Sequence, residues 1–171
     1  NIVFSEFKRE IREKKIKINK KNKNKYYFEG FKRKNGKVGT RNYIGLVSTV
    51  NCSATVVKKI ADRVNKELDE KKFKNIDGAV SLKHSTGCGM NVNGLGMSVL
   101  NKTIEGFKNH PNFGKVFVIG LGCECSQISI YQDDNDSIVY MNIQDEGGTK
   151  KIIENVSSKI IKMFPELDKD V

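Results

Sequence analysis

Thiol and imidazole side chains gather at one kind of position along this chain. All four cysteines and one of the two histidines follow a short apolar run: Cys52, His84, Cys88, Cys123 and Cys125. A thiolate or a neutral imidazole can bind a transition metal, and an imidazole can also act as a general base. A free cysteine is more often only a small buried hydrophobic residue. That interpretation does not explain why every cysteine occupies the same kind of position, and the coincidence favours a functional site.

Apolar runs of strand length alternate with segments of helical period, which is typical of consecutive βα units. The predicted strands are residues 43–49, 76–82, 115–121 and 137–143, and the predicted helices are residues 53–68, 94–109 and 149–164. We expect Ser53 to cap the first helix and Pro165 to end the last. The pattern predicts a three-layer α/β fold, flavodoxin-like or Rossmann-like. Its parallel sheet of about four strands, in the order 2-1-3-4, would have helices on both faces.

The carboxyl ends of the predicted strands define where a ligand would bind. Because parallel strands all point the same way, the segments that follow them share one edge. We therefore expect His84, Cys52, Cys88 and Cys123 to approach one another there. His110 follows a helix and precedes a strand, so we expect it at the opposite edge as a cap or turn residue. The glycines near the strand ends match neither a dinucleotide nor a P-loop fingerprint, which disfavours nucleotide binding.

The positive charge of the chain lies mainly at its start. Residues 1–34 carry 13 Lys and Arg against 4 Asp and Glu, whereas the remaining 137 residues carry 18 against 16. We predict a basic linker or tail over residues 1–25 and a single α/β domain over residues 26–171. We expect no nucleic-acid partner, since the domain itself is almost neutral. No stretch approaches the roughly 18 apolar residues of a membrane span, and we expect a cytoplasmic protein whose cysteines are thiols.

Several separated motifs carry a more specific signal than the pattern of strands and helices. They are residues 36–45 (GKVGTRNYIG), 50–55 (VNCSAT), His84 with 87–90 (GCGM), 110–113 (HPNF), 120–124 (GLGCE) with Gln127, and 143–144 (IQ) with 147–149 (GGT). In this order they resemble the core domain of the altronate and galactarate dehydratases. The resemblance extends over about residues 28–164.

The resemblance implies a carbon–oxygen lyase that removes water from a sugar acid such as altronate or galactarate. The product would be a 2-keto-3-deoxy acid, and the cofactor a divalent metal, Fe²⁺. It also implies that the chain is the central domain of a longer enzyme, whose missing C-terminal domain is a partner at the site. We expect the isolated chain to fold but to be nearly inactive, because one side of its crevice is open. Whether it forms a homo-oligomer is left open.

The resemblance also implies roles for individual residues. His84 is expected as a metal ligand or general base, and Glu124 as an acid/base or ligand. The thiols expected to line the site or bind the metal are Cys52, Cys88 and Cys123. The groups expected to bind substrate oxygens or the substrate carboxylate are Asn51, Ser53, Thr55, Gln127, Gln144 and Gly148. Cys125 departs from the family pattern, and we assign it no role.

Three other functions stay open from the sequence. The same family includes sulfolactate sulfo-lyase subunits, so the leaving group is not decided. Three of the cysteines could instead hold an iron–sulfur cluster, which the visible absorption of anaerobically purified protein would reveal. The fold could also bind a sugar acid without chemistry, and calorimetry with galactarate, paired with a turnover assay, would separate that case from catalysis.

Overall fold

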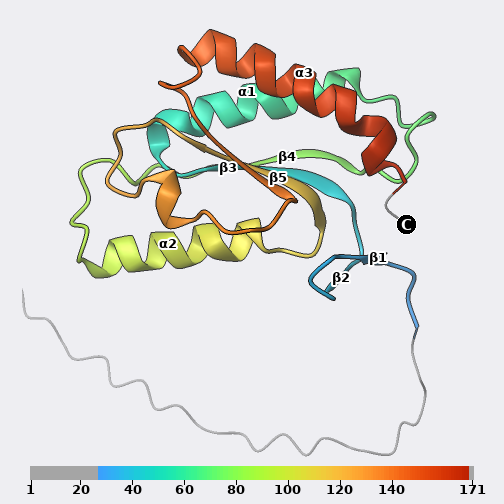
Figure 1. The fold of residues 1–171 in the computed structure, drawn as a ribbon, viewed down its shortest axis with the longest axis horizontal. Coiled ribbons are helices and arrows are strands. Elements are labelled where there is room, and N and C mark those ends of the chain that lie inside the picture. The colour runs from blue at the N-terminus through green and yellow to red at the C-terminus, as the bar shows by residue number, and fades with distance from the viewer. Residues whose placement is uncertain (1–26, 170–171) are drawn as a thin grey trace, which may run out of the picture.

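A four-stranded parallel sheet forms the centre of the molecule, between two helical layers (Figure 1). The computed structural model describes residues 27–169, so the predicted tail over residues 1–25 lies outside the described residues. The strands are β3 (Tyr43–Ser48), β4 (Gly78–Leu82), β5 (Phe113–Gly120) and β6 (Ile138–Asn142). They lie in the order β4-β3-β5-β6, and every pairing is parallel. The predicted strand order and the predicted α/β class are confirmed.

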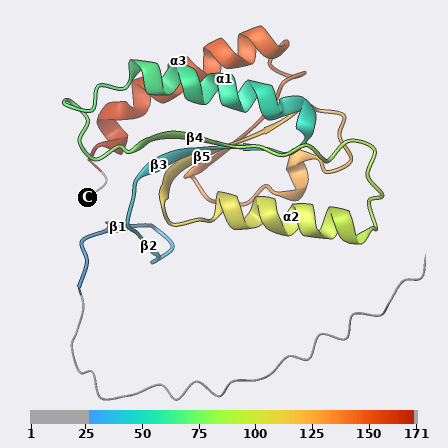
Figure 2. The same ribbon diagram turned by 180° about the vertical axis from the view of Figure 1, so that it is seen from behind.

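Helices cover both faces of this sheet. α1 (Asn51–Glu67) and α3 (Thr149–Leu167) pack side by side on one face, and α2 (Leu95–Lys108) lies on the other (Figures 1 and 2). All three begin and end within three residues of the predicted bounds. None of the helices within residues 27–169 is long and apolar enough to span a bilayer.

The connection from β5 to β6 contains no α-helix. It runs through residues 121–137, and its one regular turn is the 3₁₀ helix η1 (Ile128–Ile130). Tyr131 of this crossover belongs to the same apolar cluster as Met97 and Ile104 of α2. The crossover therefore lies on the α2 face of the sheet, beside that helix.

Both faces of β3 and β5 are buried, which explains their continuous apolar sequences. Leu46 and Phe117 pack in the cluster that includes α1 and α3, whereas Val47 and Val118 pack in the cluster that includes α2. Each of these four residues is at most 1% exposed. Burial of each such side chain contributes roughly 1.5–3 kcal/mol, so the two clusters hold the layers together.

α2 does not extend fully over the edge strand β4. α2 contacts β3 and β5 but makes few contacts with β4. A groove of about 520 Å³ remains beside β4, and Leu95 and Val99 of α2 line it. Both residues are more than half exposed. Leu82 of β4 lines the same groove and is only partly buried against the α2 cluster.

Two predictions about helix ends are wrong. Ser53 does not cap α1, because the helix begins at Asn51 with Val50 as its N-cap residue. The Ser53 hydroxyl is buried in the first turn and donates to the Val50 carbonyl at 2.9 Å. Pro165 does not end α3, which continues to Leu167. A proline in the last turn removes only one helical hydrogen bond, and Leu167 is held by its burial in the core.

A short hairpin precedes the sheet, and the sequence pattern did not indicate it. β1 (Phe31–Lys32) pairs antiparallel with β2 (Val38–Gly39), and two residues are too few for a recognisable alternation. The Arg33 Nε donates to the Pro111 carbonyl at 2.7 Å. His110 lies in the same turn between α2 and β5, at the amino edge as predicted, and its Nδ1 accepts a hydrogen bond from the Asn112 amide.

Asn42 joins three segments at this amino edge. Its side chain is buried, and its Nδ2 donates to the carbonyls of Asn75 at 2.8 Å and Leu167 at 3.1 Å. Its backbone amide donates to the Asp77 carboxylate at 2.6 Å. Gly114 passes so close to the Asn42 side-chain oxygen that a Cβ on residue 114 would overlap it. Because its hydrogen bonds hold Asn42 in place, this side chain cannot give way.

We therefore expect Gly114→Ala to lower the free energy of unfolding by about 1–3 kcal/mol, the usual cost of overpacking. The matched control is Gly106→Ala on α2, where a Cβ would meet no atom within 4 Å. That change should raise the free energy of unfolding by roughly 0.5–1 kcal/mol, because alanine loses less backbone entropy in a helix. Urea denaturation measures both. Two substitutions of equal effect would contradict the role of Asn42.

Candidate functional site

The segments that follow the four strands are joined by direct hydrogen bonds into one continuous edge. The Asn51 amide, after β3, donates to the Thr86 carbonyl, after β4, at 2.8 Å. The Thr49 hydroxyl donates to the Glu124 carboxylate, after β5, at 2.7 Å. The Gln144 amide, after β6, donates to the Leu121 carbonyl at 3.1 Å. The carboxyl edge is therefore one connected surface, and it carries every residue for which a role in the site was predicted.

His84 is held at this edge through both of its ring nitrogens. The Thr86 amide donates to Nδ1 at 3.2 Å, and the Thr86 hydroxyl lies 3.0 Å from the same nitrogen. Because an amide can only donate, Nδ1 is the acceptor and the ring proton lies on Nε2. Nε2 lies 3.1 Å from the Ser48 carbonyl and donates to it. The ring is therefore fixed in one neutral tautomer, and neither nitrogen is open to a ligand in this arrangement.

Gly87 lets the His84 loop pack against the start of α1. Its φ of 96° is one that residues with a side chain rarely adopt. A Cβ on residue 87 would lie 2.9 Å from the Thr49 carbonyl oxygen and 3.0 Å from the Val50 Cα. Only glycine therefore permits the approach that brings the Thr86 carbonyl to the Asn51 amide.

The Glu124 carboxylate closes the loop that follows β5. Glu124 is 5% exposed. One of its oxygens accepts the Leu121 amide at 3.1 Å as well as the Thr49 hydroxyl, and the other accepts the Gly122 amide at 2.7 Å. The Gln127 side-chain amide donates to the carbonyls of Gly122 and Glu124. Both side chains therefore bond to the protein itself, and their predicted roles in catalysis and substrate binding stay predictions.

The first turns of α1 and α3 form a second part of the site. A groove of about 460 Å³ begins at these turns and runs between the two helices as far as Arg63, in the fourth turn of α1. It is lined by Cys52, Thr55, Val56, Lys59, Arg63, Thr149, Lys150, Ile153 and Glu154. Neither helix has a side-chain cap or an acidic residue in its first turn. The positive ends of the two helix dipoles are thus not neutralised there. Three basic residues against one acidic residue add to this potential, so the groove favours an anion.

Other predicted residues differ in how accessible they are. Asn51, Cys52, Thr55 and Gln144 are exposed, whereas Ser53 is fully buried and is not available to a substrate in this arrangement. Gly148, with φ of 105°, is the N-cap residue of α3. The four cysteines are free and exposed.

A metal site is not complete within the described residues. Residues 27–169 contain no group of three or more His, Cys, Asp or Glu side chains that could hold a metal ion. Both nitrogens of His84 are already hydrogen-bonded. The residues present therefore do not fit a metal on their own. The predicted Fe²⁺ and its ligands His84, Cys52, Cys88 and Cys123 stay predictions.

Several residues of the edge were missed by the sequence analysis. Thr49 and Thr86 bond to the predicted catalytic side chains but are single polar residues in ordinary turns. Lys59 and Arg63 line the groove with Thr55. Their spacing of four residues along α1 places all three on one face of the helix, and this is the signal that could have found them.

The hydrogen bonds that the Glu124 carboxylate accepts give a direct prediction. In Glu124→Gln, one of the two amides that donate to separate oxygens would face an NH₂ group instead. We expect the free energy of unfolding to fall by about 1–3 kcal/mol, the cost of a buried donor without an acceptor. In Thr49→Val the carboxylate keeps both amides, so we expect a loss of only about 0.5–1.5 kcal/mol. Chemical denaturation measures the difference. A Glu124→Gln variant as stable as the wild type would show that the two amide hydrogen bonds to Glu124 do not stabilise the loop.

Comparisons with known proteins identify the family to which this chain belongs. The family model described as "D-galactarate dehydratase/Altronate hydrolase, second domain" matches residues 30–168. Altronate dehydratase of Escherichia coli (strain K12) is 33% identical over 105 residues, which are 60% of this chain and 20% of that protein. Altronate dehydratase of Bacillus subtilis (strain 168) is 35% identical over 104 residues, with the same two shares.

Galactarate dehydratase (L-threo-forming) of Escherichia coli (strain K12) is 34% identical over 142 residues, which are 77% of this chain and 27% of that protein. The matched segments thus span between a fifth and just over a quarter of the length of these relatives. The family match covers the sheet, all three helices and the connected edge. The chain belongs to the family of D-galactarate dehydratase/altronate hydrolase second domains.

Proposed function

We propose that this chain forms one wall of the active site of a sugar-acid dehydratase, at the carboxyl edge of its sheet. The observation that carries the proposal is the groove between α1 and α3, which begins at the first turns of both helices. It combines two uncapped helix N-termini with Lys59, Arg63 and Lys150. A sugar acid offers a carboxylate for that positive potential and hydroxyl groups for the polar side chains beside it.

The proposed reaction is an elimination of water. A base removes the proton from the carbon next to the carboxylate. The hydroxyl on the following carbon takes up a proton, which the protonated base can return, and leaves as water. The enol that results becomes a 2-keto-3-deoxy acid. Negative charge develops on the carboxylate during proton removal, and donors fixed in advance stabilise it. The first turns of α1 and α3 supply such donors, and Asn51, Thr55 and Gln144 are exposed beside them for the hydroxyl groups.

We propose His84 as the group that receives the proton, at Nδ1. The Ser48 carbonyl keeps the other proton on Nε2, which fixes the tautomer that a base requires. The amide and hydroxyl of Thr86 lie against Nδ1 of His84. Thr86 must therefore move away before Nδ1 can accept a proton. Substrate binding at the adjacent edge would move this loop. No step uses a metal, since the described residues do not complete a site for one.

Binding of galactarate to the chain tests the proposal by isothermal titration calorimetry. We expect measurable binding that weakens by at least about tenfold in Lys59→Gln/Arg63→Gln, because each side chain loses a charge-assisted hydrogen bond. The matched control is Lys58→Gln, since Lys58 lies on the same helix but pairs with Asp62 at 2.6 Å. Equal affinity in the double variant and the control would contradict this placement of the carboxylate.

A turnover assay on the same samples separates catalysis from binding. We expect almost no loss of galactarate with this chain alone, since its matched segments span only 20–27% of its relatives and the groove is open on one side. Dehydration at a rate typical of complete enzymes would contradict that expectation. Release of sulfite from sulfolactate would favour the sulfo-lyase alternative.

A further inference from the structure

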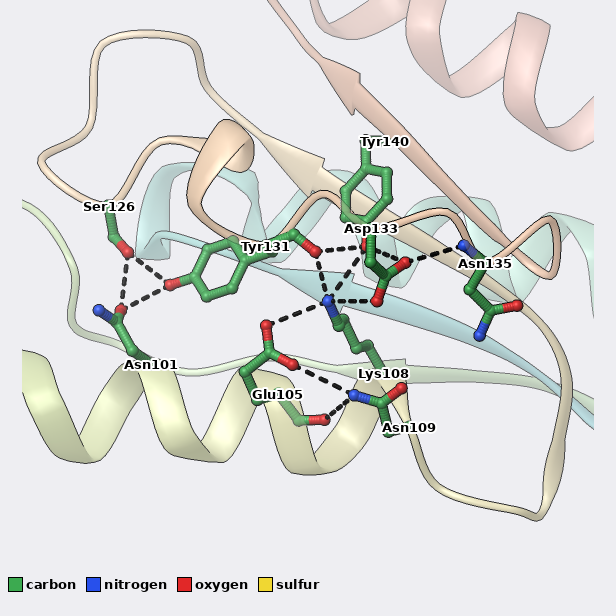
Figure 3. A network of polar contacts seen from close by, with 9 residues as sticks. All are labelled: Asn101, Glu105, Lys108, Asn109, Ser126, Tyr131, Asp133, Asn135 and Tyr140. Atoms are coloured by element: carbon green, nitrogen blue, oxygen red, sulfur yellow. Dashed lines mark hydrogen bonds and ion pairs between the residues drawn. The ribbon is translucent and has the colours of Figure 1, made fainter. Parts of the chain in front are cut away.

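The crossover between β5 and β6 needs side chains to fix it, because it has almost no regular structure of its own. It carries Cys123, Glu124 and Gln127, and it returns along the α2 face to β6. An irregular segment lacks the repeating backbone hydrogen bonds of a helix or strand. Tyr131 and Ile128 pack against the apolar cluster of α2. A network of polar contacts, shown in Figure 3, adds specific bonds from the crossover to α2 and β6.

Lys108, in the last turn of α2, lies at the centre of this network. Its side chain is 3% exposed, and its Nζ lies 3.0 Å from the Glu105 carboxylate and 2.9 Å from the Asp133 carboxylate. The same ammonium donates to the Tyr131 carbonyl and to the Tyr140 hydroxyl. Asp133 and Tyr131 belong to the crossover, whereas Tyr140 belongs to β6. One buried charge thus ties α2 to both.

Tyr131 connects Lys108 to the loop beside the candidate site. Its carbonyl accepts from Lys108, and its phenol oxygen bonds to the Ser126 hydroxyl and to the Asn101 side chain of α2. Ser126 also donates to Asn101 at 2.7 Å. Both Tyr131 and Ser126 are 1% exposed. Ser126 directly precedes Gln127, whose amide holds the carbonyls of Gly122 and Glu124.

We propose that Lys108 is a positioning residue for the candidate site. Its buried ammonium fixes the crossover and, through Tyr131 and Ser126, the loop that carries Cys123, Glu124 and Gln127. The proposal extends the proposed function, because it assumes that this loop belongs to the site. It assigns Lys108 no contact with the substrate.

The pair formed by Lys108 and Asp133 keeps its charges at neutral pH. Burial alone would lower the pKa of Lys108, but its hydrogen bonds to Asp133, Glu105 and Tyr140 raise that pKa overall. Burial alone would raise the pKa of Asp133, but the hydrogen bond from Lys108 and one from the Asn135 amide lower it overall. Each shift favours the charged form. At neutral pH the ammonium of Lys108 and the carboxylate of Asp133 in Figure 3 are therefore both charged.

Amide chemical shifts of the folded protein test the proposal without any substrate. Lys108→Met removes the ammonium and keeps an unbranched apolar stem. We expect the amide resonances of residues 121–131 to move, including those of Leu121 and Gly122, while the resonances of α3 stay in place. Lys108→Arg, which keeps the charge, should restore part of the wild-type pattern. Lys102→Met is the matched control, since Lys102 lies on α2 but is exposed and outside the network.

A merely stabilising role for Lys108 predicts something else. Gly114→Ala destabilises the protein at the amino edge without touching this network, and it should leave the resonances of residues 121–131 unchanged. If Lys108→Met leaves them unchanged as well, the proposal is wrong. If Lys108→Met does not fold, Tyr140→Phe removes one hydroxyl that bonds to Lys108, Asp133 and the Tyr131 carbonyl. It should then give smaller movements of the same resonances, and their absence would equally refute the proposal.

Galactarate titration of the same variants separates this inference from the proposed function. In Lys108→Met we expect the affinity to fall roughly two- to thirtyfold, the range found for residues coupled to a site through others. If the wild type binds no galactarate, the proposed function fails, and the chemical shifts still decide whether Lys108 positions the loop. If the loop resonances move but the affinity does not change, Lys108 does not position the site.

Discussion

Successive residues of β3 and β5 point to opposite faces of the sheet, and both sets are buried, so these strands require a cover on each side. α1 and α3 provide one cover, and α2 with the crossover of residues 121–137 provides the other. A connection between parallel strands must leave from a carboxyl end and return to an amino end. Every connection that buries the core therefore starts at the same edge, and the candidate site lies where those connections start.

The amino-acid sequence was sufficient to predict the strands and the edge, because these depend on patterns local to a few residues. The strand order was expected by analogy with flavodoxin-like folds, since the sequence alone does not fix it, and the structure has the expected order. Solid apolar runs indicated strands buried on both faces, and the alternation with helices implied parallel pairing. That topology placed His84 and His110 at opposite edges, although both residues lie in turns. The hairpin of β1 and β2 escaped prediction, since two-residue strands have no period to detect.

The parts that could not be predicted depend on contacts between residues far apart in the chain. The sequence shows that Glu124 follows a strand, but not that Thr49 and two loop amides take up its carboxylate. Ser53 has the residue type and the position of a helix cap, yet its hydroxyl bonds back to Val50. Lys108 resembles any other lysine of this lysine-rich chain. Its burial follows only once the crossover has packed against α2.

The four exposed cysteines have a practical consequence for work with this protein. Accessible thiols are the first groups that peroxide and dissolved oxygen modify, and sulfenic acids or mixed disulfides would form at or near the edge that we assign to substrate. A sample purified in air could lose its ligand affinity for this reason alone. In a binding measurement, such a loss would look the same as a requirement for the predicted Fe²⁺. Thiol reductant and metal should therefore be varied independently, with the number of free thiols counted in each preparation.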